Sequence, residues 1–109
     1  MSSVITTTIE TNRWYGDIMN NSPHPKARAL AMQDIHLEKY VTIEPILDFD
    51  LDEMVELIKM CNPTQVNIGA DSGGHKMPEP SKEKILDLID RLKEFTKIDK
   101  KINLKRLLK

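Results

Sequence analysis

Three short segments rich in β-branched residues alternate along this chain with three segments of helical character. The first strand-like segment, VITTTIET at residues 4–11, contains neither glycine nor proline, and its composition is typical of a β-strand. The clearest helical signal is the recurrence of Ile85, Leu88, Ile89 and Leu92 at helical spacing. Strands that alternate with helices pair in parallel through right-handed crossovers, so this order constrains the fold more than any other feature.

The alternation predicts an α/β fold with three βα units and a parallel sheet, followed by a short basic C-terminal tail; the family resemblance given below implies that this sheet is half-barrel-like. The length of 109 residues suits a single domain that spans residues 1–109. We expect strands at about 4–11, 39–47 and 65–71, and helices at about 26–36, 51–61 and 82–95. The tail is compatible with a strand through Ile102 and Leu104 or with a helix capped by Asn103.

Two of the helices carry further local signals. In the first, an apolar face is expected from Ala27, Leu30, Ala31 and Ile35, which fall at helical spacing. The second is expected to begin with a capping box, in which the Asp50 carboxylate accepts from the amide of Glu53.

Charge is balanced overall but not along the chain. Residues 1–75 contain 11 acidic and 5 basic side chains, whereas residues 76–109 contain 6 acidic and 11 basic ones. Between Glu44 and Glu56 six acidic residues meet no lysine or arginine. This run is explained by helix capping and a wet helix face, or it offers a complementary patch to a basic protein surface. The basic tail has no interleaved aromatic residues, which makes direct nucleic-acid binding an unlikely role.

Several polar side chains are expected at the carboxyl ends of the three strands, where ligands bind in such folds. They are Glu10 from the first strand, Glu44 from the second, and Asp71, Ser72 and Gly73 from the third. Three carboxylates on one edge can hold a divalent cation; alternatively they are solvated or pair with basic side chains nearby. The turn at Ser72 and Gly73 can present backbone amides to an anion, or it is a plain turn in which glycine permits positive φ.

Trp14 and Tyr15 follow the first strand and either anchor a partner or pack on the rim of the sheet. Cys61, the single cysteine, lies on the apolar stripe of the second helix and is expected to be a buried structural thiol. The three histidines lack metal-ligand spacing. No segment resembles a membrane span or an export signal, so we expect a cytoplasmic protein.

Three strand-end motifs together resemble a known family: TIE at 8–10 with NRW at 12–14, TIEPIL at 42–47, and GADSG at 69–73. They are similar to the T-V-E-N, V-E-P-L-L and G-G-E-S-G motifs of phage-associated radical S-adenosylmethionine-like proteins of unknown function. The likeness is to the C-terminal half of that partial TIM barrel, and it spans about residues 4–95. It departs from the pattern at Ala70 and at Asp71, where the family has glutamate.

The resemblance implies that Glu10, Glu44 and Asp71 occupy matching positions on a cofactor-facing edge. The family's cluster-binding Cys-x-x-x-Cys-x-x-Cys motif lies in the half of the barrel that has no counterpart here. A single cysteine cannot hold an iron–sulfur cluster, so the chain alone is not expected to perform radical chemistry or to carry a cofactor. A half-barrel also exposes a sheet edge, which favours pairing with another chain or with a second copy.

The leading hypothesis is a non-catalytic phage or mobile-element module that binds a protein in the host cytoplasm, such as a host defence nuclease that it inhibits, in the manner of an anti-CRISPR protein. The candidate partner-binding residues are the acidic run and the aromatic pair: Glu44, Asp48, Asp50, Asp52, Glu53, Glu56, Trp14 and Tyr15. One alternative is a C-terminal fragment or subunit of a radical S-adenosylmethionine enzyme, completed by a chain that carries the cysteines. Another is a metal-dependent hydrolase that uses Glu10, Glu44 and Asp71.

Overall fold

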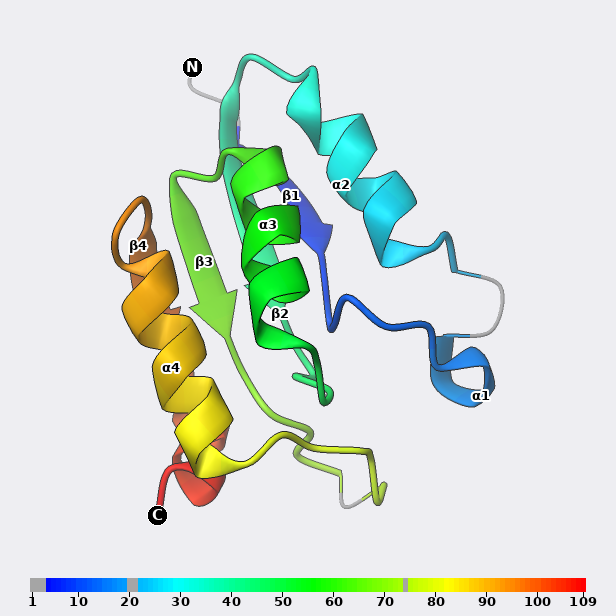
Figure 1. Cartoon of the computed structure of the whole chain (residues 1–109), viewed down its shortest axis with the longest axis vertical. Coiled ribbons are helices and arrows are strands. Elements are labelled where there is room, and N and C mark those ends of the chain that lie inside the picture. The colour runs from blue at the N-terminus through cyan, green and yellow to red at the C-terminus, as the bar shows by residue number, and fades with distance from the viewer. Residues whose placement is uncertain (1–3, 20–21, 74) are drawn as a thin grey trace.

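The structure is a computed structural model that describes residues 4–19, 22–73 and 75–109. The described strands are β1 (Val4–Thr8), β2 (Glu38–Ile43), β3 (Gln65–Ile68) and β4 (Lys97–Lys100). The helices are α1 (Gly16–Met19), α2 (Pro25–Gln33), α3 (Leu51–Cys61) and α4 (Lys82–Leu92), with a closing 3-10 helix, η1 (Ile102–Leu107) (Figure 1). The predicted α/β fold is confirmed.

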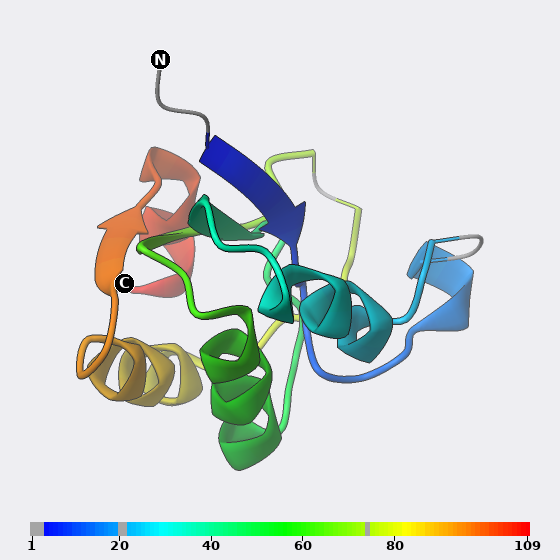
Figure 2. The same cartoon turned by 90° about the horizontal axis from the view of Figure 1, so that it is seen from above.

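The strands form one parallel sheet in the order β1-β2-β3-β4. Thr8 lies opposite Thr42, which lies opposite Asn67, and Asn67 lies opposite Asp99. The connections between neighbouring strands contain α2, α3 and α4 in turn. These three helices lie side by side on one face of the sheet (Figure 2). This arrangement is like half an α/β barrel, with the helices outside; in the part of the chain that the structure describes, α2, α3 and α4 leave the other face of the sheet uncovered.

A single apolar core fills the space between the sheet and the helices. From the sheet it receives the alternate residues Val41, Ile43, Val66 and Ile68, which are fully buried. From α3 and α4 it receives the stripes that their spacing indicates: Met54, Val55, Ile58, Cys61, Ile85, Leu88, Ile89 and Leu92. The sequence therefore placed the inner faces of these two helices correctly.

The apolar face expected for α2 is wrong at three of its four positions. Ala27, Leu30 and Ala31 are exposed, and it is Ala29 and Met32 that are buried against the core. The reason is the position of α2, which is the end member of the helix layer beside β1 (Figure 1). No described element covers its outer flank, so a narrow stripe is enough to attach the helix.

β2 ends earlier than expected, at Ile43, because Pro45 has no amide to continue the ladder. The chain then crosses the carboxyl end of the sheet. Ile46 donates its amide to the carbonyl of Gly69 at 2.9 Å, and Leu47 donates to the carbonyl of Glu10 at 3.1 Å. This buried crossing segment closes the end of the core and places the acidic run beside the strand ends.

The tail supplies a fourth strand that was not predicted. The sequence of β4 is KIDK. Only Ile98 is apolar, and it packs on the core, so the three charged residues leave no alternating pattern that would predict a strand. η1 then folds back under the strand ends and buries Leu104 completely. The tail is therefore part of the fold and not a free basic extension.

The uncovered face of the sheet is polar. In register across it lie the alternate residues of the strands that face away from the helices: Thr8, Thr42, Asn67 and Asp99, preceded by Thr6, Tyr40, Gln65 and Lys97. The interior of a closed barrel is dominated by bulky apolar side chains. This face therefore does not have the composition of a packed barrel core.

Candidate functional site

Glu10, at the end of β1, is held by one basic residue of α2. Its carboxylate accepts from Arg28 at 2.8 Å, and both side chains are about 85% buried. Arg28 also donates to the carbonyls of Thr8 and Pro23. Glu10 thus attaches the start of α2 to the end of β1, which is a structural role.

Glu44, at the end of β2, is held by two residues of the tail. Lys101 donates to one carboxylate oxygen at 2.5 Å and Asn103 to the other at 2.8 Å. The contact with Lys101 and then that with Asn103 hold the pKa of Glu44 below its usual value, despite partial burial. A Cβ on Gly69 would lie 2.8 Å from the Glu44 carboxylate and from the Asn103 side chain, so a larger residue there would displace these two hydrogen-bonded side chains.

Asp71, beyond β3, pairs locally with His75. It accepts from the His75 amide at 3.0 Å and lies 2.9 Å from the ring Nδ1. These contacts lower the pKa of Asp71 to about 2. The neighbouring Ser72 and Gly73 are exposed, and the last glycine of the predicted turn, Gly74, lies outside the described residues.

The three strand-end carboxylates therefore point to three different basic partners and do not converge. Among the residues that the structure describes, no group of three or more His, Cys, Asp or Glu side chains is placed to hold a metal ion. The carboxylates of the strand-end edge are accounted for by contacts within the chain, and they give the metal-dependent hydrolase hypothesis no support.

Asp48 and Asp50, in the middle of the acidic run, are also internally paired. The Arg13 guanidinium bonds Asp48 at 3.2 Å and both oxygens of Asp50, the closer at 2.8 Å. Lys84 of α4 reaches Asp48 at 2.5 Å. Burial opposes ionisation of Asp48, yet the Lys84 bond holds its pKa below the usual value.

The capping box expected at the start of α3 is wrong. The Asp50 carboxylate makes no capping bond and turns instead to Arg13 and Asn12, which together lower its pKa. A guanidinium that can bind two oxygens at once is a stronger partner for a carboxylate than a backbone amide. The ion pair therefore replaces the local cap.

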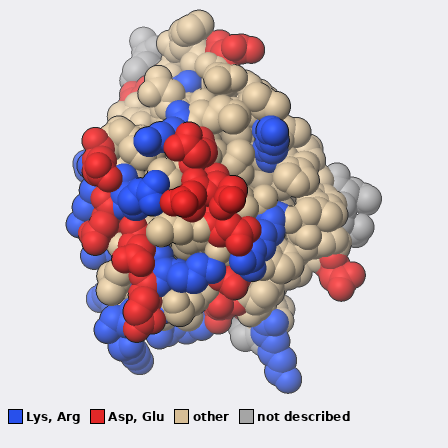
Figure 3. Space-filling model, in the orientation of Figure 1, with Lys and Arg blue, Asp and Glu red and all other residues tan. Residues whose placement is uncertain are grey.

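Asp52, Glu53 and Glu56, on the first turns of α3, differ from the carboxylates before them. The side chain of Asp52 is 84% exposed beside Arg91, and that of Glu56 is 70% exposed with Lys59 at 4.0 Å. No ion pair of Glu53 occurs among the described residues. These three carboxylates stay in contact with water on the helix face of the molecule, where acidic and basic side chains lie interspersed over α3 and α4 (Figure 3).

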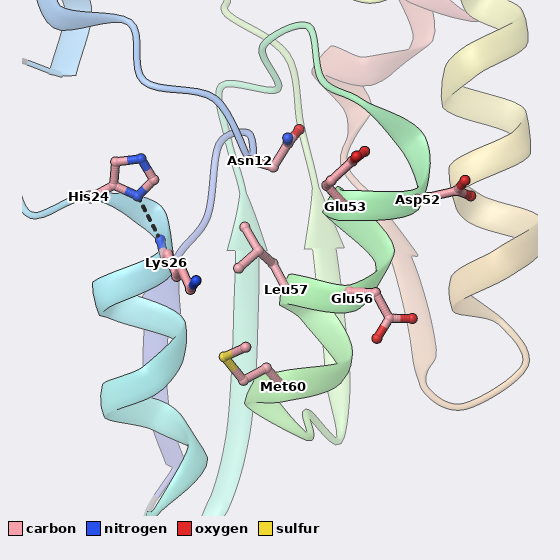
Figure 4. Close-up of a pocket in the computed structure, with 8 residues that line it drawn as sticks. All are labelled: Asn12, His24, Lys26, Asp52, Glu53, Glu56, Leu57 and Met60. Carbon is pink, nitrogen blue, oxygen red and sulfur yellow. Dashed lines mark hydrogen bonds between the residues drawn. The ribbon is translucent and has the colours of Figure 1, made fainter.

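A groove of about 530 Å³ lies beside these carboxylates, between α3 and the start of α2 (Figure 4). Its lining has an acidic wall, an apolar floor and a wall from α2: Asp52, Glu53, Glu56, Leu57, Met60, Asn12, His24 and Lys26. The size is typical of a ligand-binding site, about 300–1,000 Å³. We call this feature the α2–α3 groove.

The two aromatic candidates have different roles. The Trp14 ring stacks on the groove-lining His24 at 5.8 Å between centroids, and it is 44% exposed. Tyr15 packs inward, where its hydroxyl donates to the Asp48 carbonyl at 3.2 Å and accepts from Arg13 at 3.1 Å. The structure thus brings Trp14 next to the groove and uses Tyr15 to fix the loop after β1.

The sequence did not predict the groove, because much of its lining comes from residues outside α3 that no sequence pattern marks as part of a binding site. His24 caps α2 by accepting the Lys26 amide at 3.1 Å, a contact that no spacing rule identifies. The spacing of Glu53, Leu57 and Met60 at i, i+4 and i+7 was available in the sequence and places them on one stripe of α3.

Cys61 is buried in the core, as expected, and burial raises the pKa of its thiol to about 11.

Within the described ranges, no helix is both long and apolar enough to cross a membrane. No protein-family model, curated protein or solved structure matches this chain. The likeness to radical S-adenosylmethionine-like proteins therefore stays a prediction from the three motifs.

Proposed function

We propose that this chain is a protein-binding module whose α2–α3 groove takes a basic, partly apolar segment of another protein. The observation that carries the proposal is the convergence, around one groove, of exposed carboxylates and an apolar floor. Leu57 is 8% exposed and Met60 is half-buried at the bottom of the groove, while Asp52, Glu53 and Glu56 form its rim.

The chemistry of the lining selects the class of ligand. Three carboxylates and a single lysine, Lys26, line the groove. Asp52 is turned toward α4, where it is bonded to Arg91 (Figure 4), so Glu53 and Glu56 supply the charge that favours positively charged groups. The apolar floor requires aliphatic surface as well, which a lysine- and leucine-rich helix offers along one face. Methionine adapts its shape to different apolar partners, so Met60 suits such a site.

A direct test uses a synthetic helical peptide of lysine and leucine as the probe. Trp14 is the chain's single tryptophan and stacks on His24, so its fluorescence reports on the groove without a label. We expect saturable binding that weakens about tenfold or more in Glu53→Gln/Glu56→Gln, because two carboxylate contacts at roughly 0.7 kcal/mol each correspond to that factor.

The matched control is Asp87→Asn/Asp90→Asn, which removes the same charge from exposed positions on α4 that do not line the groove. We expect less than a twofold change in this variant. Equal weakening in both variants would show attraction to net charge and would contradict the proposal. Binding of spermine as tightly as the peptide would contradict a role for the apolar floor.

Inhibition of a host nuclease is one form of this proposal, because a nucleic-acid channel is a source of basic segments. Of the acidic run, Glu53 and Glu56 are the most open to such a surface, since Glu44, Asp48, Asp50 and Asp52 are each paired with a distant basic residue. A cleavage assay with and without the protein tests it, with Glu53→Gln/Glu56→Gln as the variant expected to lose inhibition. Unchanged cleavage at saturating protein would reject the nuclease as the target.

The second candidate is a subunit of a radical S-adenosylmethionine enzyme completed by another chain. The polar, uncovered face of the sheet favours it, because such a face suits the wall of a site better than a packed core. Calorimetric titration with S-adenosylmethionine, alone and with a neighbouring gene product that carries the three-cysteine motif, distinguishes the two candidates. Binding that appears only with the second chain would support the subunit; no binding in either case would exclude it.

A further inference from the structure

The two free edges of the sheet differ in how well they are protected against pairing with a strand of another chain. β4 ends the sheet with the sequence KIDK, and charged side chains on an edge strand discourage pairing with another chain. β1 ends it with VITTT, which has no charge, no proline and no glycine, and its residues have high strand propensity. Among the described strands, only β1 is therefore an unprotected template for a further strand.

The backbone groups of Thr6 are at the centre of this template. Ile9 donates its amide to the Thr42 carbonyl of β2 at 2.9 Å, so by alternation Thr6 and Thr8 direct their backbone groups away from β2. The Thr8 carbonyl is taken by Arg28. In the part of the chain that the structure describes, no group outside β1 bonds the Thr6 amide or carbonyl, so both can pair with a strand that arrives from outside.

The surface beside β1 carries few charged side chains, and the exposed ones of α2 and its caps lie at the two ends of the helix, at Lys26 and Asp34. The outer flank of α2 exposes Ala27, Leu30 and Ala31, and Val4 of β1 is 42% exposed. In the space-filling view the side of the molecule formed by α2 carries few charged residues, whereas those over α3 and α4 are dense (Figure 3). A surface that pairs with itself across a two-fold axis brings identical residues together, so it must avoid like charges.

We infer that β1 pairs with β1 of a second copy of this chain, antiparallel and centred on Thr6. A two-fold axis at that residue lets the two Thr6 residues exchange both backbone hydrogen bonds, and it places Val4 opposite Thr8 of the partner. The two α2 helices then meet on the helix side of an eight-stranded sheet, where alanines permit close approach. This surface is separate from the α2–α3 groove, so the inference does not depend on the proposed function.

Sedimentation equilibrium over a range of concentrations tests the pairing. We expect a monomer–dimer equilibrium for the wild type and a dissociation constant at least tenfold weaker for Thr6→Pro, which removes the outward amide but no bond within the sheet. The matched control is Lys100→Pro, which removes an outward amide from the β4 edge and is expected to leave the dimer intact. A wild type that stays monomeric at millimolar concentration would overturn the inference, as would equal loss in the two proline variants.

A charge-complementation experiment distinguishes loss of the dimer from loss of folding in the Thr6 variants. Thr6→Lys and Thr6→Glu are each expected to be monomeric, because like charges meet at the axis, and their equimolar mixture is expected to form a dimer at low salt. A mixture that remains monomeric would overturn the inference. Peptide binding at the groove is expected to persist in every Thr6 variant, so failure of the dimer and failure of the proposed function are distinguishable.

Discussion

The acidic run consists of two halves with the same residue types and different surroundings. In the paired half, Glu44, Asp48 and Asp50 each meet a basic side chain more than 30 positions away in the sequence. In the open half, Glu53 and Glu56 have no such distant partner among the described residues and remain on the exposed face of α3. Asp52 lies between the two cases, because its side chain is 84% exposed and is also bonded to Arg91 at 3.0 Å. The difference teaches that an acidic segment in a sequence has no single role. Long-range ion pairs use the first half for the fold, whereas the second half stays exposed and is the part that we propose to bind a ligand.

Among changes near the paired half, the largest loss of stability is expected where the Glu44 carboxylate lies against the backbone of Gly69. Gly69→Ala places a Cβ 2.8 Å from the Glu44 carboxylate and the Asn103 side chain, and overpacking of this kind costs about 1–3 kcal/mol. Urea unfolding measures the loss. Gly16→Ala is the control, because its Cβ would meet nothing closer than 3.4 Å; equal effects of the two substitutions would refute the tight packing of Glu44.

Removal of one charge from the paired half should lower stability by a smaller amount. In Asp48→Asn, Lys84 and Arg13 lose a shared carboxylate, and for a partly exposed site we expect a loss of about 1–2 kcal/mol. Thermal and urea unfolding give the value. Asp87→Asn on α4 is exposed and should change stability by less than about 0.5 kcal/mol; a similar loss there would mean that net charge alone is responsible.

Acid should weaken the fold through the paired half. The pKa values of Glu44, Asp48 and Asp50 are lowered from ordinary values of 4.5, 3.8 and 3.8, and that of Asp71 is about 2. A group with a lowered folded pKa stabilises the fold above its unfolded pKa and loses that contribution as pH falls through the folded value. Melting temperatures should therefore be constant above about pH 5 and fall between about pH 4.5 and 2.

The pH profile also separates the two halves. The fall in melting temperature should be shallower in Asp48→Asn and unchanged in Glu53→Gln/Glu56→Gln. An acid dependence that disappears in the open-half variant would reverse the assignment of roles.

Neutralising the open half should leave stability almost unchanged. Because Glu53 and Glu56 are exposed and only Glu56 has a basic neighbour, at 4.0 Å, Glu53→Gln/Glu56→Gln should change the free energy of unfolding by less than about 0.5 kcal/mol. Unfolding in urea, with the wild type beside it, measures the change. A loss as large as that of Asp48→Asn would show that both halves serve the fold.

Local patterns predicted the parts of this molecule that depend on near neighbours. The stripes of α3 and α4 followed from spacing, and Ser81 caps α4 by accepting the Lys84 amide at 3.2 Å, as its type indicates. β4 was missed because Ile98 stands alone among charged residues, and the face of α2 was misjudged because the sequence does not tell that the helix ends its layer. The candidate carboxylates were identified, but apart from the local contact between Asp71 and His75 their partners come from the loop after β1, from α2, α4 and the tail. No local rule connects these distant pairs.

The most direct test of the division between the two halves is a nuclear magnetic resonance titration of the labelled protein with the lysine–leucine peptide. We predict that amide shifts concentrate at the α2–α3 groove, on Lys26, Glu53, Leu57 and Met60, together with the indole of Trp14. Signals of Asp48 and Asp50 should remain in place, since their carboxylates are already bound. Shifts that centre on Asp48 and Asp50, or that spread evenly over exposed acidic residues including Asp87, would contradict the division.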